Sequence, residues 1–162
     1  MSQPGSYSVA NDDRRTVTFV RTLPAAPERI WRALTERAEL AAWLAPATIE
    51  PWEGGAVTIE FEGEDSLTTG TVLTWAPYTT LEHSWHYTGE DRLVVRYDLT
   101  PVAGGTELTL VHRLLQGDQA AGHGAGWHAH LASLTAVLAG TTTDWETDFA
   151  AELPRYRELA AG

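Results

Sequence analysis

The feature that most constrains the fold is residues 47–114, where apolar and polar side chains alternate. A period of two is typical of strands with one buried and one wet face. Turn sequences interrupt it at 62–65, 89–91 and 104–105. Strands joined by such short turns pair antiparallel, so the stretch predicts a meander of about six strands. Its expected buried face comprises Val57, Ile59, Phe61, Leu81, His83, Trp85, Tyr87, Leu93, Val95, Tyr97, Leu99, Leu108, Leu110, His112 and Leu114.

Helical patterns flank the meander on both sides. A first strand over residues 15–22 is followed by two short helices, near 27–35 and 36–43, the first with Pro27 in its opening turn. After a glycine-rich break at 117–126, a helix is expected over about 127–138, because Trp127, Leu131, Leu134 and Leu138 form one apolar stripe. We divide the chain into a flexible arm (1–14), one domain (15–140) and a C-terminal helical extension (141–162), where Pro154 should end or kink the helix.

Composition and charge exclude several classes of function. The net charge of −11 leaves no basic footprint for nucleic acid and disfavours anionic membrane surfaces. The 162 residues contain no cysteine, which excludes disulfides and thiolate metal sites. Neither a signal peptide nor a membrane span is evident, so we expect a cytoplasmic protein.

The order of elements predicts an α+β protein: a curved antiparallel sheet of about six or seven strands around a long C-terminal helix. Such a sheet tends to leave a hollow beneath the helix, and a ligand would bind there. Seven tryptophans fit this picture, because large rings line pockets as well as cores.

Several short motifs, taken in order, resemble a known family. They are residues 27–35, residues 40–44 with Trp43, Gly54-Gly55, residues 70–72, residues 104–110 with His112, and Gly126-Trp127 ahead of the leucine stripe. Together they resemble proteins related to the activator of Hsp90 ATPase, within the START/polyketide cyclase/Bet v 1-like superfamily. The resemblance implies the helix-grip fold over 15–140. It implies little about function, because the family's members bind unrelated small molecules or act as cochaperones.

The candidate site is the aromatic and histidine-bearing part of the buried face. Polar atoms buried there need a partner or a ligand, and aromatic walls with few polar groups suit a small apolar molecule. The other interpretation is a packed core whose polar atoms are satisfied internally, and for any single residue we prefer it. The candidate lining residues are His83, Trp85, Tyr87, Tyr97, His112, Phe61, Trp127 and Leu131.

Other patterns carry weaker hypotheses. His123, His128 and His130 lack the spacing of a helical metal pair, so we expect solvated or helix-entry histidines, no metal and no cofactor. The glycines at 122–126 suit either a mobile gate or a plain connection. The carboxylates at 60–65 are expected in solvent. In the extension, Trp145 and Phe149 would cap the fold or form a homodimer patch.

Three functions remain open at this stage. The first is a protein that binds a small hydrophobic or aromatic ligand, with the tips of His83, Tyr97 and His112 orienting it. The second is a cyclase/aromatase- or hydrolase-like enzyme with His83 or His112 as general base, its catalytic residues otherwise unknown. The third is a cochaperone-like interaction protein, which would need a large exposed apolar patch.

Overall fold

The computed structural model describes residues 3–9, 14–61, 67–87 and 92–161, apart from the side chain of Asp118. The turns expected at 62–65 and 89–91 lie outside these residues. No helix in the described ranges is long and apolar enough to cross a membrane. The elements are β1 (Ser6–Val9), β2 (Arg15–Leu23), α1 (Pro27–Thr35), α2 (Arg37–Trp43), β3 (Ala47–Ile49), β4 (Ala56–Ile59), β5 (Thr68–Ala76), β6 (Thr80–Trp85), β7 (Leu93–Val102), β8 (Gly105–Leu115), α3 (Gly117–Leu138) and α4 (Trp145–Ala161).

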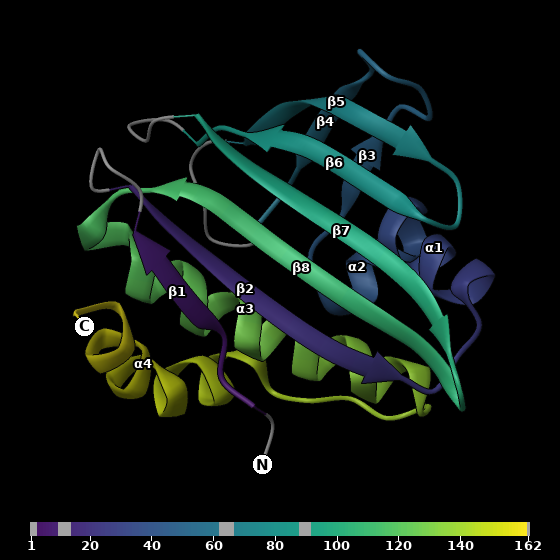
Figure 1. Ribbon diagram of the computed structural model, residues 1–162. Coiled ribbons are helices and arrows are strands. Elements are labelled where there is room, and N and C mark those ends of the chain that lie inside the picture. Colours follow the sequence, from purple (N-terminus) through teal and green to yellow (C-terminus); the bar gives the residue numbers. More distant parts are fainter. Residues whose placement is uncertain (1–2, 10–13, 62–66, 88–91, 162) are drawn as a thin grey trace.

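The strands form one curved antiparallel sheet in the order β1-β2-β8-β7-β6-β5-β4-β3. The α+β helix-grip architecture expected from the alternation is confirmed, with eight strands in the described residues rather than six or seven. At the β7–β8 hairpin, Gly104 has a φ of 85°, a conformation that glycine adopts without steric cost. The sheet curves around α3, and α4 packs on α3 beside the N-terminal strand (Figure 1).

The short helices α1 and α2 are held to the fold by tryptophans. The Trp43 indole Nε1–H donates to the Ala33 carbonyl oxygen at 2.8 Å, and the side chain is 3% exposed. The ring of Trp31 packs edge-on against Trp75 of β5, with centroids 5.1 Å apart. These contacts anchor α2 to α1 and α1 to the sheet.

The main correction to the expected elements concerns α3, which begins at Gly117 rather than near Trp127. The glycine-rich segment is therefore helical, and neither a gate nor an irregular connection. A Gln116–Gln119 capping box closes its first turn. Gly124 is required by packing, because a Cβ there would lie 2.0 Å from the Tyr7 hydroxyl and 2.6 Å from the Tyr156 ring. Tertiary contacts thus override the low helix propensity of glycine.

Three further expectations fail locally. Residues 6–9 of the expected arm pair with β2 as an edge strand. Leu114 is exposed while Leu115 is buried, because Leu114 has a φ of 72° and a register shift opposite it reverses the alternation. Helix α4 continues past Pro154, so of the two outcomes expected there, the proline does not end the helix; just before α4, the Asp144 carboxylate accepts from the Thr147 hydroxyl at 2.7 Å.

Candidate functional site

The two histidines expected on the buried face lie in one row across the sheet. His83 of β6 is opposite Val95 of β7, which is opposite His112 of β8. Tyr97 lies in the next row, between Leu81 and Leu110. His83 is 2% exposed and His112 is fully buried, so the alternation placed both side chains on the correct face.

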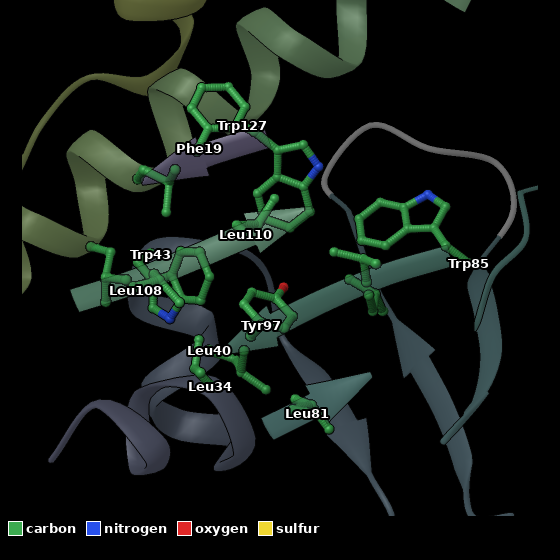
Figure 2. Close-up of a cluster of buried hydrophobic side chains, with 14 of the residues drawn as sticks. Phe19, Leu34, Leu40, Trp43, Leu81, Trp85, Tyr97, Leu108, Leu110 and Trp127 are labelled. Atoms are coloured by element: carbon green, nitrogen blue, oxygen red, sulfur yellow. The ribbon is translucent and has the colours of Figure 1, made fainter. Parts of the chain in front are cut away.

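Aromatic rings surround His112 on the concave side of the sheet. Its centroid lies 5.2 Å from that of Trp85, 6.0 Å from that of Trp127 and 4.8 Å from that of His123. Figure 2 shows Trp85 reaching from β6 toward Trp127 on α3, with the Tyr97 ring between the two elements. Phe61, just after β4, packs on Trp85 at 5.6 Å. The tertiary fold therefore brings most of the predicted lining residues into one cluster.

A hydrogen bond from α3 determines which nitrogen of His112 carries the proton. The Trp127 indole Nε1–H donates to His112 Nδ1 at 2.7 Å, and an indole nitrogen can only donate. The neutral imidazole must therefore hold its proton on Nε2. In the described residues, Nε2 is the one buried side-chain nitrogen or oxygen without a hydrogen-bond partner. His112 thus presents an unpaired N–H donor inside an aromatic cluster.

His83 has the opposite tautomer. Its Nδ1–H donates to the Ser84 carbonyl oxygen at 2.8 Å, which leaves Nε2 as an acceptor. Burial lowers the pKa of His83 to about 4, against smaller opposing effects of the Ser84 hydrogen bond and of Glu82. Burial is the main cause that lowers the pKa of His112 well below its ordinary value, and His123 and His83 lower it further. Both imidazoles are therefore neutral at neutral pH.

Two further predicted lining residues, Leu131 and Tyr87, differ in their burial. Leu131 of α3 is 1% exposed and belongs to the apolar core. Tyr87 lies past the end of β6 and is half-buried, so the alternation that we extended to it does not continue there. Tyr97 is 2% exposed, and burial raises the pKa of its phenol, so the hydroxyl remains protonated.

The sequence interpretation missed His123 and His130 as members of the aromatic cluster. The His123 ring faces Trp85 and His112. The His130 ring contacts Trp127, and its Nδ1–H donates to the Trp43 carbonyl oxygen at 3.1 Å. Burial lowers the pKa of His130 to about 4. The helical spacing of residues 123, 127, 130 and 134 indicates one helix face. We did not predict the helix from residue 117 because the glycines in this segment favour a loop.

His128 belongs to a separate, buried cluster and lies well inside α3, so it is neither of the expected alternatives, a solvated or a helix-entry histidine. It is 6% exposed, and its Nδ1 lies 2.8 Å from the Tyr156 hydroxyl of α4. Its Nε2 lies 3.6 Å from a Glu152 oxygen, which favours a proton on that nitrogen. The Tyr156 hydroxyl also accepts the Gly5 amide proton at 2.7 Å. This cluster joins α3, α4 and the N-terminal strand.

Away from this aromatic cluster, the described residues offer little for a metal ion or a second ligand. Within residues 3–9, 14–61, 67–87 and 92–161, no group of three His, Cys, Asp or Glu side chains could hold a metal ion. A groove of about 400 Å³ lies between β1 and the end of α4. Its one charged lining residue, Arg15, already donates through Nε to the Ala160 carbonyl oxygen at 3.0 Å. None of the predicted site residues lines this groove.

Comparison with solved structures gives the same fold over nearly the whole chain. CalU16 from Micromonospora echinospora is 20% identical, with a TM-score of 0.79 and coverage of 98% of this chain and 96% of that one. The protein encoded by BPP1335 from Bordetella parapertussis is 25% identical, with a TM-score of 0.71 and coverage of 98% and 92%. The Aha1 dimer from Colwellia psychrerythraea is 20% identical, with a TM-score of 0.64 and coverage of 76% and 95%.

The search of curated proteins finds no match. The family model described as "Activator of Hsp90 ATPase homolog 1-like protein" matches residues 24–139, from the end of β2 through α3. The match ends before α4, whereas CalU16 covers the extension as well. Because the model matches most of the chain, the protein belongs to the family of proteins like the activator of Hsp90 ATPase homolog 1.

Proposed function

We propose that the protein binds a small hydrophobic or aromatic molecule between β6–β8 and α3. The observation that carries this proposal is the unpaired Nε2–H of His112, buried among Trp85, Trp127 and His123. Leaving a buried donor unpaired costs about 1–3 kcal/mol, and a bound acceptor would recover part of that cost. The helix-grip fold and the family are consistent with a ligand-binding domain.

The test is a thermal-shift screen with aromatic compounds and lipids, followed by titrations read from tryptophan fluorescence. A ligand at a hundred times its Kd should stabilise the protein by about 2.7 kcal/mol. Trp85→Ala should weaken binding, since the Trp85 ring forms one wall of the cluster. Trp52→Ala is the matched control, because Trp52 is 53% exposed and should not affect binding. The proposal fails if no compound class stabilises the protein.

The enzyme hypothesis has less support from the geometry. A general base needs a free lone pair, and the lone pair of His112 accepts the Trp127 indole proton. His83 keeps a lone pair on Nε2, but with a pKa of about 4 it is a weak base at neutral pH. The two histidines therefore suit ligand recognition better than proton abstraction.

The cochaperone hypothesis requires an exposed apolar surface. The candidate in the extension was the pair Trp145 and Phe149. These rings stack on each other at 4.9 Å, Trp145 also packs on His130 of α3, and Phe149 packs against the core. They therefore fit the capping role better than a patch for a partner or a second copy. A pull-down with an Hsp90 homologue tests this alternative, and capture would favour it over ligand binding.

A further inference from the structure

The hydrogen-bonding character of the concave face limits the chemistry of its ligand. We infer that the site selects an uncharged, flat molecule with a carbonyl-type oxygen, which accepts the Nε2–H of His112. This inference rests on the proposed function and narrows it to one class of ligand. Three features of the site support it: the donor, the charge and the shape of the aromatic cluster.

The donor is held in one tautomer and cannot change role. His112 could offer Nε2 as an acceptor only by moving its proton to Nδ1, and the Trp127 indole, 2.7 Å away, occupies that nitrogen as a donor. Rotating the ring would break that bond and leave the indole unpaired in the core, where Trp127 is 3% exposed. The ligand atom that meets Nε2 must therefore be an acceptor. The same bond prevents Nε2 from binding a metal ion, which needs a lone pair.

Charge excludes ionic ligands from this position. A carboxylate or phosphate would be buried beside the neutral His112 and the rings of Trp85 and Trp127. An ion buried without a counter-charge costs several kcal/mol, more than one neutral donor returns. The net charge of −11 also repels anions. A cation meets the opposite difficulty, since Nε2–H offers it no lone pair. An uncharged acceptor fits best.

The walls favour a flat molecule. The Trp85 and His112 planes meet at 59°, and those of Trp85 and Trp127 at 58°, so the rings are tilted against one another rather than stacked. Phe61 extends the Trp85 side. Aromatic ligands gain from face and edge contacts with such rings, in addition to the area that they bury. An aromatic ketone combines this shape with the required acceptor.

The test compares pairs of compounds that differ only at the acceptor. The probes are 9-fluorenone with fluorene, in which CH₂ replaces C=O, and the smaller pair 1-indanone with indane. Titrations of the full chain give a Kd for each compound. We expect the ketone of a pair to bind about fivefold to tenfold more tightly, the ratio that one buried neutral hydrogen bond provides. His112→Phe, which keeps a ring of similar size, should abolish this preference. The control His86→Phe, an exposed histidine next to Trp85, should retain it.

A second measurement does not depend on any variant. On binding, the infrared C=O stretch of the ketone should move to lower frequency, because a hydrogen bond weakens that bond. Equal Kd values within each pair, with an unshifted C=O stretch, would overturn the inference while leaving the proposed function intact. Preference for an anionic analogue, 9-fluorenone-1-carboxylate, would also overturn it. If all probes fail to bind, the proposed function fails for flat aromatic ligands, and the inference fails with it.

Discussion

Replacing Tyr156 with phenylalanine tests how the C-terminal helix holds the N-terminal strand. Tyr156 of α4 is fully buried, and its hydroxyl accepts the Gly5 amide proton at 2.7 Å. It also lies 2.8 Å from His128 Nδ1. Because Glu152 favours a proton on Nε2 of His128, Nδ1 accepts and the Tyr156 hydroxyl donates. One oxygen thus satisfies groups on two other elements.

The substitution Tyr156→Phe keeps the ring, so packing against Tyr7 and Phe19 is retained and no large cavity forms. What is lost is the hydroxyl that pairs both the Gly5 N–H and His128 Nδ1, and leaving the buried backbone N–H without its acceptor alone costs about 1–3 kcal/mol. We expect the free energy of unfolding to fall by about 2 kcal/mol. For a chain of this size, that corresponds to a decrease in Tm of about 4–8 °C.

Urea unfolding followed by circular dichroism measures the global effect, and hydrogen exchange of the amides in β1 measures local opening. Tyr78→Phe is the matched control, because Tyr78 is 49% exposed and the change should cost less than about 0.5 kcal/mol. If Tyr156→Phe changes stability no more than the control, and exchange in β1 is unaltered, the reasoning about this hydroxyl is wrong.

Three other predictions concern buried histidines and the packing of α3. Because burial lowers the folded-state pKa of His83 and His130 to about 4, the unfolded chain takes up protons first as pH falls below about 6.5. Above that pH the free energy of unfolding should not depend on these two histidines. Between about pH 6.5 and about pH 4 it should fall by up to about 1.4 kcal/mol per pH unit for each histidine. Urea titrations in which His83→Leu fails to reduce this slope would contradict the prediction. Gly122→Ala should stabilise the protein by about 0.5–1 kcal/mol, since nothing lies within 4 Å of the new Cβ. Gly124→Ala should destabilise it, because its Cβ would clash. Thermal melts in which both substitutions shift Tm in the same direction would refute the packing argument. Trp127→Phe should lower the free energy of unfolding by about 2–4 kcal/mol, measured in urea, because it leaves His112 Nδ1 unpaired. In the wild type, ¹⁵N NMR of the His112 imidazole should show the proton on Nε2. A proton on Nδ1 would exclude the hydrogen bond from Trp127.

The faces of the central strands were predictable because side-chain alternation is a local property of an extended backbone. Leu108, Leu110 and His112 are all buried as their spacing predicts. The rule failed at Leu114, where a positive φ and a register shift reverse it. A bulge of this kind depends on the partner strand and leaves no clear mark in the sequence.

The α3 boundary was missed for a related reason. Glycine has low helix propensity, so residues 117–126 resemble a loop when they are considered alone. In the structure, the absence of a side chain at Gly124 makes room for Tyr7 and Tyr156, which come from the two ends of the chain. Local propensity cannot include a contact whose partners lie that far away in the sequence.

By itself, the sequence determined that a sheet with one apolar face would be covered by a helix, and that His83, Tyr97 and His112 would lie on that face. It could not determine what their polar atoms do. The unpaired Nε2–H of His112 exists because α3 places the Trp127 indole 2.7 Å from Nδ1. Tautomer, burial and lack of a partner are set by atoms brought together only in the folded chain, and they leave a core histidine with an unpaired N–H donor.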